Sequence, residues 1–148
     1  MKRHSVLIPF SHSHHEALLV ALRLKKGGPS SANDTLWPKE PLEQAQALLR
    51  FADRELYPHF SLEEEYLFPA AAGKSEKIDT LISGLLSDHS GFRSALAAFN
   101  RPADSSSIAA QLKQFGEDLE RHIRLEEREL FPLIEIEVEK RNIILGSA

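Results

Sequence analysis

The chain has 148 residues, of which 42% are hydrophobic and 27% are charged. This composition is typical of one folded globular domain and is too apolar for a disordered chain. The formal net charge of -4 comes from interspersed acids and bases, so we expect no nucleic-acid partner. Cysteine is absent, which excludes disulfides, thiol catalysis and thiolate metal ligands.

The N-terminal segment MKRHSVLIPFSHSHH contains basic residues, but polar side chains interrupt its apolar stretch, so we predict no signal peptide. The longest apolar run, Ala17 to Leu22, is far too short to cross a bilayer. We therefore expect a cytoplasmic protein without a membrane partner, folded as a single domain over residues 1–148.

Glycine and proline cluster at 27–41, around Gly73 and at 100–107, and these clusters divide the chain into four segments. The first segment carries four leucines between residues 18 and 24 and ends at Gly27-Gly28, a pair typical of a helix C-terminus. In the other three, apolar residues recur at steps of three and four. These stripes are Leu49, Ala52, Leu56, His59, Glu63 and Tyr66; then Ile78, Ile82, Leu85, His89, Phe92, Leu96 and Phe99; then Ile108, Leu112, Phe115, Leu119, His122 and Glu126.

This periodicity indicates the inward faces of packed helices, and nothing in the chain alternates as a strand does. Four helices of roughly 15 to 28 residues joined by short loops predict an all-α fold, an antiparallel up-and-down four-helix bundle. Pro58 should kink the second helix or restart it just before His59. Phe68-Pro69 and Phe131-Pro132 are expected to end their helices.

One motif occurs twice, as HFSLEEEYLFP at 59–69 and HIRLEERELFP at 122–132. Each copy places a glutamate four residues after a histidine, in the pairs His59–Glu63 and His122–Glu126, so both side chains share one helix face. These positions lie on the inward stripes. Because buried carboxylates are costly without a compensating charge, the pairs predict a metal site in the core of the bundle.

The other two helices supply further histidines. His89 lies on the stripe of the third segment, and the first segment offers His12, His14 and His15. Alignment of HHEALLVAL (14–22) with DHSGFRSAL (88–96) places His15 opposite His89, so His15 is the chosen ligand. His12 lies one turn earlier on nearly the same face, and either His12 or His14 remains an alternative.

The predicted ligand set is therefore one histidine from each helix plus two glutamates. Its members are His15, His59, Glu63, His89, His122 and Glu126, with His12 as a weaker candidate. Nitrogen and oxygen donors without sulfur favour iron first and manganese second, with zinc less favoured. Glutamates on opposite helices are able to bridge two metal ions, and the histidines would complete each end.

Along essentially its whole length the chain resembles the hemerythrin-like, or HHE, cation-binding domain. The resemblance rests on the HHE triplet at 14–16, His59 with Glu63, Asp88-His89, and His122 with Glu126. It implies a four-helix bundle that holds two iron ions, bridged by two carboxylates and by an oxo or hydroxo group.

The chain departs from the oxygen-carrying members of that family at two places. Their third helix has an HxxxH pair, whereas here the residue four after His89 is Arg93. Their last carboxylate lies five residues after its histidine, a spacing that Glu127 would satisfy, whereas the repeat favours Glu126. The chain is thus more similar to bacterial members with two HxxxE pairs, among them proteins implicated in iron–sulfur cluster repair and nitrosative stress.

The resemblance implies a di-iron protein that reacts with or senses oxygen, peroxide or nitric oxide, in redox or nitrosative stress or in iron homeostasis. The alternative is a non-catalytic module that stores or delivers iron or binds oxygen. Whether the protein is an enzyme, and its oligomeric state, stay open. Arg93 either points to water or, if turned inward, would donate hydrogen bonds to a small anionic ligand. Tyr66 is expected to be a core aromatic, and the alternative is that its phenol hydrogen-bonds a bridging carboxylate or a metal-bound oxygen.

Overall fold

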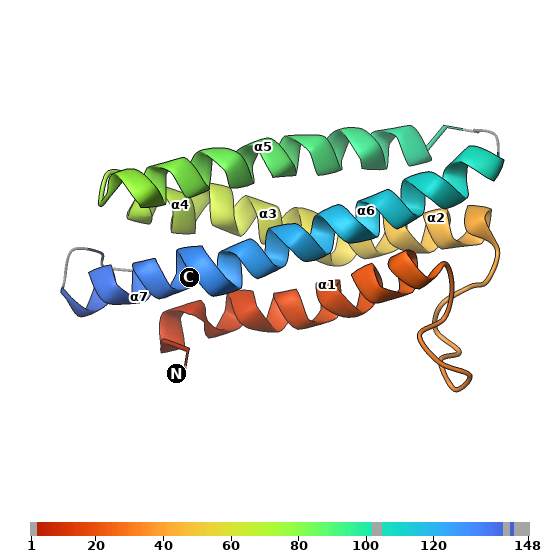
Figure 1. Ribbon diagram of the computed structural model, residues 1–148, viewed down its shortest axis with the longest axis horizontal. Coiled ribbons are helices and arrows are strands. Elements are labelled where there is room, and N and C mark those ends of the chain that lie inside the picture. Colours follow the sequence, from red (N-terminus) through yellow and green to blue (C-terminus); the bar gives the residue numbers. More distant parts are fainter. Residues whose placement is uncertain (1–2, 102–104, 141–142, 144–148) are drawn as a thin grey trace.

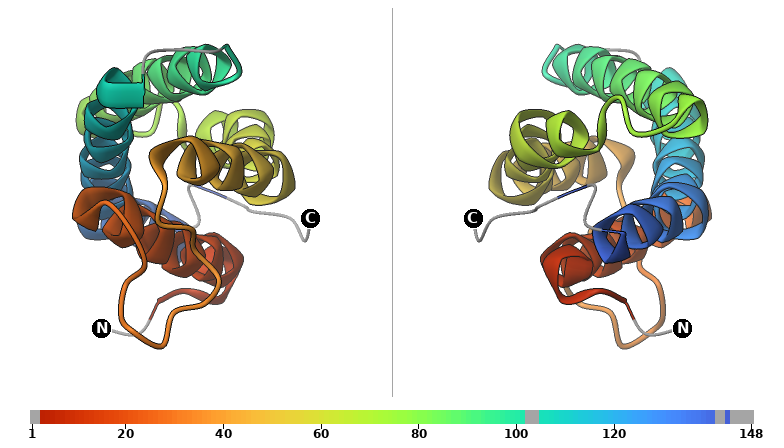
Figure 2. Two further views of the ribbon diagram at one scale, coloured as in Figure 1. Left: turned by 90° about the vertical axis from the view of Figure 1, so that its right-hand side faces the viewer. Right: turned by 90° about the vertical axis from the view of Figure 1, so that its left-hand side faces the viewer.

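The computed structural model describes residues 3–101, 105–140 and 143, and this part of the chain contains helices and turns but no strand. Four helical stretches lie lengthwise along the long axis of the molecule and are joined at its two ends (Figure 1). The end-on views show these stretches arranged around a shared interior (Figure 2). The helical prediction is confirmed.

The four stretches contain eleven elements in the described residues. They are η1 (Ser5–Leu7) and α1 (Ile8–Lys26); α2 (Pro41–Phe51), η2 (Ala52–Leu56), α3 (Tyr57–Leu62), η3 (Glu63–Leu67) and α4 (Phe68–Ala71); α5 (Glu76–Phe99); and α6 (Ser105–Leu125), η4 (Glu126–Leu130) and α7 (Phe131–Glu139). The predicted stop of the first helix is confirmed, because Gly27 adopts a left-handed φ of 84° and its N–H donates to the carbonyl of Arg23.

Three wide π-helical turns, η2, η3 and η4, each come directly before an aromatic residue and a proline. A proline ring lacks an N–H and clashes with the carbonyl four residues earlier, and a wider turn removes that clash. At η2 the N–H of Tyr57 donates to Ala52, and Pro58 then lies in the first turn of α3. The second stretch therefore continues as helix past Pro58 without a restart.

The prediction that Phe131-Pro132 ends its helix is wrong, because α7 continues to Glu139. At the equivalent Phe68-Pro69 the helix ends soon afterwards, at Ala71. The same local motif thus permits both outcomes, and the residues that follow it decide where the helix ends.

The apolar core forms two clusters on either side of a polar layer. One cluster comes from residues 17–24, 37–60 and 92–123, and the other from residues 7, 67–85 and 130–143. In each helical stretch the buried polar residues of this layer lie where the chain passes from one cluster to the other, with His59 and His122 directly before the last residues of the first cluster, Phe60 and Ile123. The polar layer is therefore enclosed by hydrophobic packing at both ends.

Gly116 allows close approach of α6 to α1, because a Cβ atom there would lie 2.8 Å from the carbonyl oxygen of Ala21 and 2.8 Å from Cβ of Leu24. We expect Gly116→Ala to lower the free energy of unfolding by about 1–3 kcal/mol through overpacking. Gly84→Ala is the control, since nothing lies within 4 Å of the added Cβ. There, loss of helical glycine should raise stability by roughly 0.5–1 kcal/mol. Denaturant unfolding measures both, and equal stability of the two variants would contradict the close packing.

Candidate metal centre

Six histidine and glutamate side chains converge in the polar layer, and they come from all four helical stretches. They are His14, His59, Glu63, His89, His122 and Glu126. All six are buried, and both glutamates have no exposed surface. Histidine and carboxylate groups are rarely buried together unless they are paired or bind a metal.

The cluster contains two groups of possible metal ligands that share both glutamates. One group is His14, His59, Glu63 and Glu126, and the other is Glu63, His89, His122 and Glu126. Within each group the ligand atoms all lie within 4.8 Å of one another. Each group thus offers two imidazole nitrogens and two carboxylate oxygens around one point.

The inward-facing atoms of the cluster lie close together but form no hydrogen bonds. Glu63 Oε1 lies 3.2 Å from His89 Nε2 and 3.4 Å from His59 Nε2, and Glu126 Oε1 lies 2.7 Å from His122 Nε2. All four imidazole Nε2 atoms and all four glutamate oxygens of the cluster are buried without a hydrogen-bond partner in the described chain. Buried polar atoms are normally satisfied, so eight converging unsatisfied atoms fit bound metal cations.

The electrostatics of the cluster also favour a cation. Burial raises the pKa of Glu126 well above its ordinary value, and the negative charge of Glu63 raises it further. Burial lowers the pKa of His122, and the hydrogen bond with Asp88 offsets this only in part. His122 is therefore held neutral, the form that binds a metal, while the two carboxylates need a positive charge between them.

A family model of the hemerythrin HHE cation-binding domain matches residues 7–134. The chain belongs to this family. The matched span includes every residue of the metal-ligand cluster, from His14 to Glu126. No curated protein and no solved structure matches the chain. None of the helices in the described part is long and apolar enough to span a membrane.

In this hemerythrin-like domain, three of the four site histidines form a hydrogen bond with a carboxylate through Nδ1, the ring nitrogen that does not face the cluster. The contacts are His14 Nδ1 with Glu127 Oε2 at 2.6 Å, His89 Nδ1 with Glu64 Oε2 at 2.7 Å, and His122 Nδ1 with Asp88 Oδ2 at 2.9 Å. Donation from Nδ1–H to a carboxylate places the proton on that nitrogen and leaves the Nε2 lone pair for a metal. The ring orientations are thereby set before any ion binds.

The repeated Glu-Glu dipeptide now has a structural explanation. Its first residue, Glu63 or Glu126, faces the cluster, and its second, Glu64 or Glu127, accepts from a histidine of a neighbouring helix. The open choice between Glu126 and Glu127 is thus decided by geometry in favour of Glu126 as the inward carboxylate.

Two of the supporting carboxylates are in turn paired with arginines. Arg93 donates to both oxygens of Glu64 at 2.7 and 3.0 Å and lies over the ring of Phe60. These hydrogen bonds lower the pKa of Glu64. Arg3 contacts Glu127 Oε1 at 3.2 Å and lies over the ring of Phe131. Of the two directions left open for Arg93, the inward one toward a small ligand is not adopted, because its guanidinium pairs with Glu64.

The structure gathers five of the six predicted ligands: His59, Glu63, His89, His122 and Glu126. His15 is corrected to His14, because His14 is buried in the cluster whereas His12 and His15 are both exposed. The inward stripe of α1 continues through Ala17 and Ala21. The alignment of residues 14–22 with 88–96 instead placed Leu22 on the inward stripe. Because Leu22 is half exposed, this assignment of the inward face was wrong by one residue.

Several other polar residues do not join the cluster. Tyr66 is 59% exposed, so its predicted place on the inward stripe is wrong and its phenol does not reach a bridging carboxylate. Glu65 is also exposed. The supporting role of Asp88 was not predicted, although its position directly before His89 is visible in the sequence. Contact with His122 depends on the packing of α5 against α6, and no local pattern indicates it.

Proposed function

We propose that the protein is a non-haem di-iron protein that reacts with or senses oxygen, peroxide or nitric oxide, built on an antiparallel up-and-down four-helix bundle. The observation that carries the proposal is that both ligand groups share Glu63 and Glu126. Two ions held by common carboxylates form a bridged pair, the usual way in which bundle cores hold two metals.

One iron would be bound by His14 and His59, the other by His89 and His122, with the two glutamates common to both. Nitrogen and oxygen donors without sulfur suit iron better than the metals that favour thiolates, and manganese or zinc would fit less well. Four protein donors at each ion leave coordination positions for a small external ligand. Bound iron would supply one-electron redox chemistry.

The residues around the centre restrict what reaches it. A cavity of about 10 Å³ lies beside His14, His59 and His122, and its other walls include Phe51 and Phe60. A space of this size is near the lower limit for one water molecule. It favours a very small ligand over a bulky substrate.

The test begins with elemental analysis of protein produced with sufficient iron, which should contain about two iron atoms per chain. Stopped-flow mixing of the reduced protein with oxygen should then give the ferric near-ultraviolet spectrum without a long-lived oxygenated form. Zinc-loaded protein is the control and should show no such change. A stable and reversible oxygenated spectrum would favour oxygen storage. Iron that is inert to oxygen, peroxide and nitric oxide would favour iron storage or delivery.

A further inference from the structure

Asp88 differs from the other two carboxylates that support site histidines. Glu64 is paired with Arg93, and Glu127 with Arg3. The Asp88 carboxylate, among the described residues, has His122 as its sole hydrogen-bond or ion-pair partner. Its side chain is 38% exposed, so the free oxygen is accessible. One supporting carboxylate thus lacks the cation that its two counterparts have.

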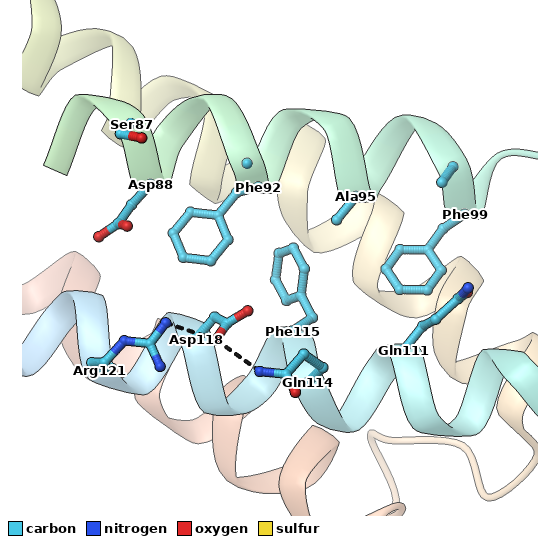
Figure 3. Close-up of a pocket in the computed structure, with 12 residues that line it drawn as sticks. Ser87, Asp88, Phe92, Ala95, Phe99, Gln111, Gln114, Phe115, Asp118 and Arg121 are labelled. Atoms are coloured by element: carbon cyan, nitrogen blue, oxygen red, sulfur yellow. Dashed lines mark hydrogen bonds and ion pairs between the residues drawn. The ribbon is translucent and has the colours of Figure 1, made fainter. Parts of the chain in front are cut away.

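Asp88 opens into a groove of about 390 Å³ between α5 and α6 (Figure 3). Its apolar wall consists of the rings of Phe92, Phe99 and Phe115, with Phe92 and Phe115 centroids 5.2 Å apart. Small residues at positions 91, 95 and 98 of α5 leave the space open. The volume is that of a site for a small organic molecule.

The charge in the groove is negative. Its charged lining residues are Asp88, Asp118 and Arg121, which sum to a net charge of -1. Arg121 donates to Asp118 Oδ1 at 2.8 Å, and Gln114 donates to the same oxygen at 2.9 Å (Figure 3). The arginine in the groove is therefore paired with Asp118, and Asp88 carries the uncompensated charge.

We propose that this groove binds a small organic cation with a flat apolar body. Its positive group would pair with Asp88 as Arg93 pairs with Glu64, and its body would lie against the phenylalanine rings, which also attract cations. The site itself does not require metal. Because Asp88 orients His122, occupancy should also alter the metal centre, and this coupling rests on the proposed function.

The experiment is calorimetric titration of the full chain with benzamidinium, and with benzamide as a neutral probe of the same shape. We expect benzamidinium to bind at least about tenfold more tightly, the size of a charge-assisted hydrogen bond. Asp88→Asn should remove this preference, while the amide oxygen of the substituted side chain still accepts from His122. Asp53→Asn, the same change at an exposed position outside the groove, should preserve it. Ala95→Leu, which narrows the groove, should weaken both probes.

Equal affinity for the two probes, an unchanged preference in Asp88→Asn, or no binding of benzamidinium to the unaltered chain would overturn the proposal. Iron content and melting temperature are measured on every variant, so loss of fold is detected separately. A protein that holds iron but shows one of these contrary titration results refutes only the proposed cation site in the groove. A protein that binds benzamidinium through Asp88 but holds no iron refutes only the di-iron function.

Discussion

Glu63→Ala and Glu126→Ala are each expected to abolish metal loading, whereas Glu65→Ala should not change it. Each inward glutamate belongs to both ligand groups, so its removal takes a donor from both metal positions at once. Glu65 is exposed on the same helical turn as Glu63 and is the matched control. The iron content after iron loading, measured by elemental analysis, should therefore fall from about two ions per chain to nearly none in the first two variants.

The histidines should behave differently, because each belongs to only one group. His14→Ala or His89→Ala is expected to remove about one ion per chain and leave the other largely bound. His15→Ala, one position along α1 and exposed, should retain both. If His15→Ala lost metal and His14→Ala did not, the assignment of the α1 ligand would be wrong. If Glu65→Ala behaved as Glu63→Ala does, the bridging carboxylates would be misassigned.

The fold was predictable because apolar residues repeat at steps of three and four between clear glycine and proline breaks. The ligand pairs of the second and fourth stretches were predictable because each lies within one helix. On α1 the pattern was ambiguous. Near the cluster its inward face carries His14 and the small Ala17 and Ala21, while the larger Leu19 and Leu22 are exposed. The size and hydrophobicity of the leucines therefore favoured an inward face that is displaced by one residue from the true one.

Local sequence patterns could not predict which side chains of different helices contact each other. The pairs His89–Glu64 and His122–Asp88 each join two different helices. Their formation depends on helix rotation and spacing, which periodicity does not determine. The same reason explains why the sequence left the direction of Arg93 open, since its partner Glu64 lies on the facing stretch.

Removal of the metal is expected to lower the melting temperature substantially. Metal-free protein retains eight buried, unsatisfied nitrogen and oxygen atoms that converge in the core. An ion present at about one hundred times its dissociation constant stabilises the folded state by roughly 2.7 kcal/mol, which corresponds to about 8 °C for a chain of this size. Thermal unfolding with and without chelation measures the difference. Coincident curves would mean that no ion occupies the cluster.

The difference in melting temperature between metal-loaded and metal-free protein should grow as the pH rises. In metal-free protein the pKa of Glu126 is raised, because burial and the charge of Glu63 disfavour its ionised form. The stability that this group contributes is fully present below its unfolded pKa and is lost as the pH rises through the raised folded value. Metal binding has the opposite dependence, since protons compete with metal for the ligands at low pH.

Glu126→Gln separates these two effects. Glutamine resembles the protonated carboxyl group and cannot ionise, so the metal-free variant should lose the pH dependence that Glu126 causes. Above the raised pKa it should be more stable than the metal-free parent, because a buried charge beside Glu63 is absent. With iron present the order should reverse, since the amide is a weaker ligand and the parent alone gains the binding energy. Melting curves of both proteins across the pH range, with and without iron, test this. An unchanged order on addition of iron would show that Glu126 does not bind metal.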